Sequence, residues 1–148
     1  MTKVSYDTII RIQEVMNCLK RIDSRDAVEK FLTQTKEILS DKNFNLKKNF
    51  KLLEVRSSTG DARNRDTLLA LDYSSRDVVE EIKKLTVKDY KETVIDDMPG
   101  RTLPFYCFVK FIEIDQVYIK FKLSEVHGRQ IFCVSFHFVD YPAYRFRA

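Results

Sequence analysis

The last part of the sequence places a titratable imidazole inside a segment that alternates like a β-strand. Residues 130–142 read QIFCVSFHFVDYP, and His137 is one of two histidines in the chain. Successive side chains of a strand point to opposite sides. One side then carries Ile131, Cys133, Ser135 and His137, and the other carries Phe132, Val134, Phe136 and Phe138. His137 is therefore expected to face away from a row of phenylalanines.

The preceding segment, residues 116–126 (QVYIKFKLSEV), offers polar groups on one side. Gln116, Tyr118, Lys120 and Lys122 alternate with Val117, Ile119, Phe121 and Leu123. Cross-strand neighbours on one face lie about 5 Å apart. If the polar sides share one face of a sheet, Tyr118, Lys120 and His137 form a single patch. Lys110, from the segment FYCFVKFIEI, joins it if its strand is turned the same way.

A patch of this composition is suited to RNA. Lysines bind phosphates, and an aromatic ring stacks on a base. Cleavage without a metal needs a base for the ribose 2′-OH, cations for the phosphorane, and an acid for the leaving 5′-oxygen. The patch could supply all three. The alternative is an ordinary solvated sheet face with a hydrogen-bonded structural histidine.

Helices are expected before these strands. Apolar spacing predicts one helix over residues 5–22 and a second after Ser24. Residues 50–56 (FKLLEVR) are strand-like, and SSTGDARN is a loop. Short helices are predicted for RDTLLALDY and SSRDVVEEIKKL, with a further helical turn after Thr86. The segment ETVIDDMPGRTLP is expected to be a loop.

From residue 105 onward the period changes to two. Three segments, residues 105–114, 116–126 and 129–139, are separated by very short links, and HG at 127–128 is a hairpin turn signal. They predict an antiparallel meander. The fold class is therefore α+β, with N-terminal helices followed by a C-terminal antiparallel sheet. We expect one domain over residues 1–148, made of an N-terminal helical extension (1–45) and a core (46–148).

Composition narrows the function classes. The chain has 148 residues, 44% of them hydrophobic and 32% charged, with a net charge of +4, so a polyanionic partner is permitted. We expect neither a membrane span nor a signal peptide. Three cysteines without paired spacing fit a reducing cytoplasm. No glycine-rich phosphate loop or zinc motif occurs, so we expect no cofactor and no metal. A cysteine–histidine pair, Cys107 or Cys133 with His137, stays conceivable.

The segments LTVKDYK, QVYIK and VSFH occur in this order across residues 85–137. This ordered set resembles the MqsR-type toxins of bacterial type II toxin–antitoxin systems, which are mRNA interferases with a RelE-like fold. The resemblance covers roughly Asp66 to Pro142. It implies a sequence-preferring endoribonuclease that cleaves mRNA to 2′,3′-cyclic phosphate and 5′-hydroxyl ends, inhibits translation and growth, and is neutralised by a cognate antitoxin protein.

The resemblance also implies roles for residues. The family's active-site lysine falls on Lys91, next to Tyr90, and its strand tyrosine falls on Tyr118, followed by Lys120. His137 stands where the family has a lysine, and the family's glutamine has no counterpart in FYCFVKF.

As a hypothesis, His137 is the general acid or base. Tyr118 positions the RNA or protonates the leaving 5′-oxygen. Lys91 and Lys120 bind the scissile phosphate. Tyr90, Lys110 and Lys122 bind RNA. The alternatives are a non-catalytic RNA- or protein-binding module, and an interaction protein that uses its sheet edge and N-terminal helices.

Overall fold

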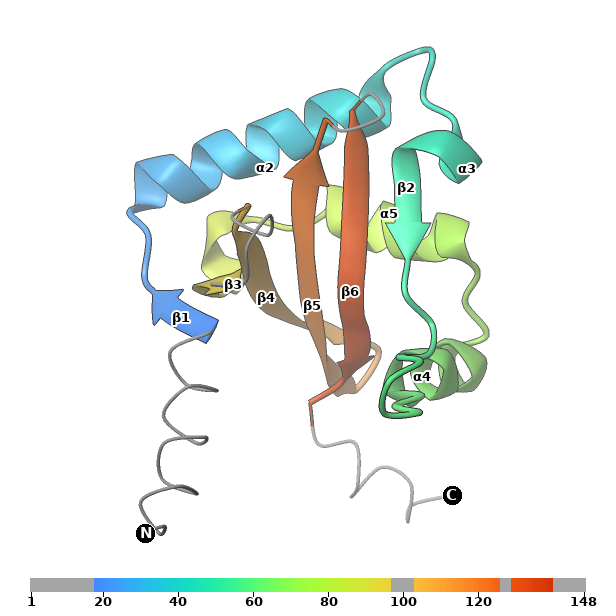
Figure 1. Cartoon of the computed structure of the whole chain (residues 1–148). Helices are drawn as coiled ribbons and strands as arrows, with labels where there is room; N and C mark the ends of the chain where they lie inside the picture. The colour runs from blue at the N-terminus through green and yellow to red at the C-terminus, as the bar shows by residue number, and fades with distance from the viewer. Residues whose placement is uncertain (1–17, 97–102, 126–128, 140–148) are drawn as a thin grey trace, which may run out of the picture.

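The protein has an α+β fold built on a six-stranded mixed sheet (Figure 1). The computed structural model describes residues 18–96, 103–125 and 129–139. Its strands are β1 (Cys18–Arg21), β2 (Phe50–Leu52), β3 (Tyr90–Asp96), β4 (Phe105–Ile112), β5 (Asp115–Ser124) and β6 (Gln130–Phe138). They lie in the order β1-β3-β4-β5-β6-β2. All neighbours are antiparallel except β2, which runs parallel to β6.

Except for α4, the helices of the described residues begin where the sequence places capping groups. They are α2 (Arg25–Ser40), α3 (Leu46–Asn49), α4 (Arg63–Leu71), α5 (Ser75–Lys83) and the short 3₁₀ helix η1 (Val87–Asp89). The Ser24 hydroxyl accepts a hydrogen bond from the Ala27 amide at 3.2 Å, which confirms the predicted start of α2. Ser74 caps α5, and Thr86 with Asp89 forms a capping box at η1. None of these helices is both long and apolar enough to cross a membrane.

Helices α2 and α5 pack on the same face of the sheet, called here the core face. The Phe31 ring of α2 stacks on Tyr106 of β4, with 3.8 Å between ring centroids. Val78 and Ile82 of α5 are fully buried in the same cluster. In Figure 1 these two helices lie behind β5 and β6. The opposite face of the sheet, called the outer face, is turned toward the viewer. Helix α2 contributes buried side chains to the core.

Several expectations are wrong. Residues 18–21 form β1 rather than the end of a helix, and residues 92–96 belong to β3 rather than to a loop. The sheet is mixed, because β2 adds in parallel to an otherwise antiparallel sheet. The meander of β4, β5 and β6 is confirmed. The predicted helix over residues 5–17, the loop at 97–102 and the turn at 127–128 lie outside the described residues.

A β-bulge changes the faces of β6. Lys120 pairs with Ser135, but its neighbour Phe121 pairs with Cys133, so Val134 is an extra residue. The buried side chains of β6 are consequently Ile131, Cys133, Phe136 and Phe138. The predicted row is therefore wrong at Phe132 and Val134, whereas Phe136 and Phe138 face away from His137 as predicted. Phe132 lies on the outer face together with His137, whereas Cys133 lies in the core.

Helix α4 covers the edge of β6 where β2 has ended. The Asn64 side chain donates to the Leu53 carbonyl at 2.6 Å and to the Val134 carbonyl at 2.9 Å, and it accepts from the Phe136 amide at 2.9 Å. Thr67 accepts from the Phe138 amide at 3.2 Å. Two side chains of α4 thus satisfy backbone groups that a neighbouring strand would otherwise pair.

Candidate functional site on the outer sheet face

The centre of the candidate site is a tyrosine–histidine pair on neighbouring strands. Tyr118 of β5 lies directly opposite His137 of β6 in the register, and their ring centroids are 5.5 Å apart. Lys120 lies two residues further along β5 on the same face, opposite Ser135. The prediction that Tyr118, Lys120 and His137 share a face is therefore confirmed. All three side chains are half-buried.

Lys110 does not join this patch, and the expectation that it would is wrong. Its register partner is Val117, whose side chain is fully buried on the core face. The Lys110 ammonium lies 2.8 Å from a carboxylate oxygen of Glu81 on α5. The second Glu81 oxygen accepts a hydrogen bond from the Tyr73 hydroxyl at 2.7 Å. Lys110 is thus part of a polar cluster on the core face.

Tyr90 and Lys91 also lie away from the pair. The Tyr90 ring packs against Tyr106 and Phe108, and its hydroxyl accepts from the Asp23 amide at 2.9 Å. It therefore helps to fix the segment before α2. Lys91 is exposed at a bulge of β3. Strands β4 and β5 separate β3 from β6, a distance of about 14 Å.

The surroundings of His137 define its protonation. Its Nδ1 lies 3.0 Å from the Phe138 carbonyl oxygen. A carbonyl can only accept, so in this contact Nδ1 carries the hydrogen and Nε2 keeps a lone pair in the neutral ring. Burial lowers the pKa of His137 below its usual 6.5 and outweighs the hydrogen bond to the Phe138 carbonyl, which raises it; Arg63 lowers the pKa further and Asp61 raises it. His137 is thus a neutral base at pH 7.

Two arginines line a hollow with His137, Arg56 from the loop before α4 and Arg63 as the first residue of α4. This small hollow beside β6 is lined by Leu53, Arg56, Asp61, Arg63, Asn64, Val134, Ser135 and His137. Backbone bonds join Arg56 to Asp61 across a tight turn, in which Gly60 has a φ of 73°, a left-handed conformation that favours glycine. Arg63 hydrogen-bonds both carboxylate oxygens of Asp61, at 2.8 to 3.2 Å. These bonds lower the pKa of Asp61 to about 2.

These arginines were missed by the sequence analysis. The stretch RSSTGDAR, residues 56–63, was interpreted only as a loop. Its signal was the pair of cationic residues that brackets a glycine turn. Nothing local indicates that this turn lies beside the end of β6, because that position depends on the parallel pairing of β2 with β6.

Neither cysteine considered above forms a nucleophilic pair with His137. Cys133 is fully buried on the core face, and burial raises its pKa to about 12. Cys107 is on the outer face but on β4, with β5 between it and His137. Burial raises the pKa of Cys107, although a hydrogen bond with the Tyr118 side chain opposes this.

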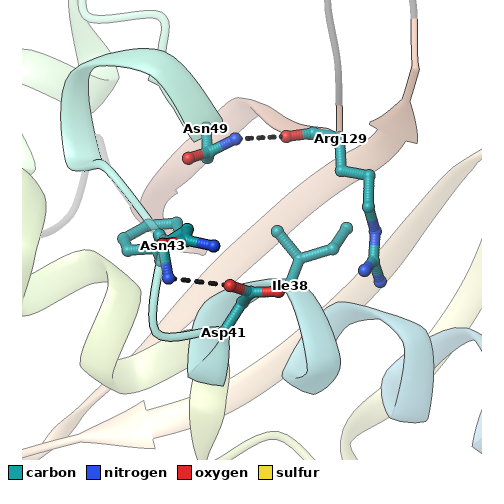
Figure 2. Close-up of a pocket in the computed structure, with 6 residues that line it drawn as sticks. Ile38, Asp41, Asn43, Asn49 and Arg129 are labelled. Atoms are coloured by element: carbon teal, nitrogen blue, oxygen red, sulfur yellow. Dashed lines mark hydrogen bonds between the residues drawn. The ribbon is translucent and has the colours of Figure 1, made fainter.

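A second hollow is shown in Figure 2, between the end of α2, α3 and the residue before β6. Its lining is Ile38, Asp41, Asn43, Phe44, Asn49 and Arg129. The side-chain amide of Asn49 donates to the Arg129 carbonyl at 2.7 Å. The Asp41 carboxylate accepts from the backbone amide of Asn43 at 2.7 Å. The first bond ties α3 to the residue before β6, and the second lies within the α2–α3 connection. The hollow lies at the opposite end of β6 from His137, about 26 Å of strand away.

Comparisons with protein-family models, with curated proteins and with solved structures gave no match to this chain. The described residues contain no group of three or more histidine, cysteine, aspartate or glutamate side chains arranged to hold a metal ion.

Proposed function

We propose that the protein is a metal-independent endoribonuclease of the MqsR type, with a RelE-like fold, acting as the toxin of a type II toxin–antitoxin system. The observation that carries the proposal is a neutral, half-buried His137 paired with Tyr118 and flanked by the cations Arg56, Arg63 and Lys120. Its substrate is mRNA in the cytoplasm, and its protein partner is a cognate antitoxin. The partner follows from the resemblance alone, and the compartment follows from the three cysteines without paired spacing.

The proposed reaction is an internal transesterification. Nε2 of His137 takes the proton of a ribose 2′-OH, and the 2′-oxygen attacks the adjacent phosphorus. Lys120 and the arginines of the hollow stabilise the extra negative charge of the phosphorane. The bond to the 5′-oxygen then breaks, and that oxygen takes a proton from the Tyr118 hydroxyl. The products are a 2′,3′-cyclic phosphate and a 5′-hydroxyl, with His137 left protonated and Tyr118 deprotonated. Loss of the His137 proton to water and uptake of a proton from water by Tyr118 restore both groups for the next turnover.

The positions of the two titratable groups support this division of roles. A base with a lowered pKa is mostly unprotonated at pH 7, so His137 suits proton removal better than proton donation. In-line attack needs the base and the acid on opposite sides of the phosphorus. His137 stands on β6 and Tyr118 directly opposite it on β5. A phosphate placed over the seam between these two strands would have one group on each side.

A non-catalytic RNA-binding module is the second candidate. It is favoured by the placement of Lys91, which the resemblance implies, and of Lys110, which the strand pattern suggested, outside the site. Fewer cations therefore lie near His137 than the sequence analysis expects. A third candidate is an interaction protein whose N-terminal helices bind a partner. The packing of α2 argues against this role for that helix. Its Phe31 is part of the core, so deletion of residues 1–45 would expose the sheet.

A cleavage assay in EDTA tests the proposal. Wild-type protein, His137→Ala, Lys120→Ala and the control Lys30→Ala, an exposed lysine of α2, are incubated with mixed-sequence RNA. Product ends are then mapped. We expect 2′,3′-cyclic ends from the wild type and from Lys30→Ala, loss of about 100-fold or more without His137, and a smaller loss without Lys120. Equal cleavage by wild type and His137→Ala would remove His137 from the chemistry. Binding without cleavage by wild-type protein would favour the second candidate.

A further inference from the structure

An aromatic pair with two lysines lies on the outer face beyond Lys120. Phe105 of β4 and Phe132 of β6 flank Lys122 of β5, and their ring centroids are 6.4 Å apart. The Lys122 ammonium lies 4.9 Å from the Phe105 centroid and 5.8 Å from that of Phe132. The Lys120 ammonium lies 5.3 Å from the Phe105 centroid. The bulge in β6 is what brings Phe132 to this face.

These rings are only half-buried, although phenylalanine gains most from full burial. Within the described residues, both long helices pack on the core face, so neither covers the two rings. An ammonium resting on an exposed ring is a weak contact compared with base–aromatic stacking. A nucleobase can therefore replace the lysines on the rings, and the freed ammonium groups can turn to the phosphates beside that base.

The pair is also aligned with the proposed cleavage site. Lys122, Lys120 and Tyr118 follow one another along the outer side of β5, and His137 lies opposite Tyr118. From Lys122 to Tyr118 the strand rises about 13 Å, a span of roughly two nucleotides of an extended strand. An acidic protein segment would use the same lysines, but it has no need of two open ring faces.

We propose that Phe105 and Phe132 form a base-stacking subsite for single-stranded RNA, about two nucleotides from the scissile phosphate, with Lys120 and Lys122 on the flanking phosphates. The inference rests on the proposed RNA substrate, but it does not require that the RNA is cleaved. It adds two binding residues that neither the motifs nor the resemblance indicates.

The test is a binding assay with the full-length protein and a 2′-O-methyl RNA of about 12 nucleotides, which cannot be cleaved because the nucleophile is blocked. Fluorescence anisotropy compares the intact probe with a series in which one base at a time is removed and its phosphate kept. Wild type is compared with the double variant Phe105→Leu/Phe132→Leu. Phe111→Leu is the matched control, since Phe111 is exposed at the other end of β4. Thermal melts verify that each variant is folded.

We expect one abasic position to weaken wild-type binding about tenfold, and the double variant to lose both that affinity and its sensitivity to that position. Phe111→Leu should keep both. Equal binding of all probes by wild type, or a uniform loss in the double variant at every position, would overturn the stacking role. So would binding of poly-glutamate with no binding of RNA. Cleavage of unmodified RNA is measured separately, so failure of the proposed ribonuclease activity leaves this result interpretable.

Discussion

Replacing Lys110 with methionine should destabilise the protein without weakening RNA binding. The ammonium of Lys110 is 2.8 Å from Glu81, and the two side chains are only 14% and 12% exposed. Loss of one partner of a buried ion pair costs about 3–5 kcal/mol. Some solvent reaches this pair, and the Tyr73 hydroxyl still bonds the carboxylate. We therefore expect a loss of about 2–3 kcal/mol at pH 7, or about 6–9 °C in Tm.

The pH dependence of this loss follows from Glu81. Burial alone would raise the pKa of Glu81, but hydrogen bonds from Lys110 and Tyr73 outweigh burial and hold the pKa below 4.5. In the wild type, the Glu81 carboxylate stabilises the fold at pH values above the pKa that it has in the unfolded chain. This stabilisation is lost as the pH falls through the lower pKa of the folded state. Without Lys110 the burial effect dominates, the folded pKa rises, and the charged form is disfavoured at neutral pH. Lys110→Met should therefore be less damaging at pH 4 than at pH 7.

Urea unfolding followed by circular dichroism at both pH values measures the effect. Lys51→Met, at an exposed position of β2, is the control and should change stability by less than about 0.5 kcal/mol. Adding Glu81→Gln to Lys110→Met should recover part of the loss, because it removes the unpaired charge. A loss under about 1 kcal/mol at pH 7, or weaker RNA binding by the folded variant, would refute the placement of Lys110 on the core face.

Three further outcomes are expected. The rate of cleavage should rise with pH with a midpoint below 6.5, because burial lowers the pKa of the base His137. A midpoint above 6.5 in a pH profile of kcat/KM would exclude this role. Asp61→Asn should cost about 1 kcal/mol at pH 7 after allowance for solvent screening, since the aspartate pKa of about 2 reflects its bonds to Arg63; urea titrations should show the difference vanish as pH falls from about 4 to 2. Asn64→Ala should cost about 2–3 kcal/mol, because the Phe136 amide and two carbonyls lose their partner, whereas Asn43→Ala should be nearly neutral in the same thermal melts.

Short-range signals in the sequence predicted much of this fold. Ser24 and Ser74 cap helices where the sequence places them, because a cap depends on residues within one turn. The pairing of Tyr118 with His137 was also predictable, since β5 and β6 are joined by a short link and must be neighbours. Elements whose partners are close in the chain are specified by local chemistry.

The errors arise where a distant partner decides. β1 and β3 pair with each other across more than 70 residues, and neither has a clear apolar alternation. The alternation around Lys110 is blurred because its partner, Glu81, is on α5. The bulge at Val134 moves Phe132 to the outer face, and one extra residue in a strand leaves no mark in the local pattern.

Helix α4 links the stability of the sheet to the geometry of the site. Asn64 and Thr67 hold the amides of Phe136 and Phe138, the two residues on either side of His137. Arg63 directly precedes Asn64, so the bonds that close the edge of β6 also fix an arginine beside the imidazole. A variant that loosens α4 should therefore displace Arg63 and His137 relative to each other before the sheet unfolds. Cleavage by Asn64→Ala should fall more steeply than its thermal stability does, and a proportional fall in both would mean that α4 serves only the fold.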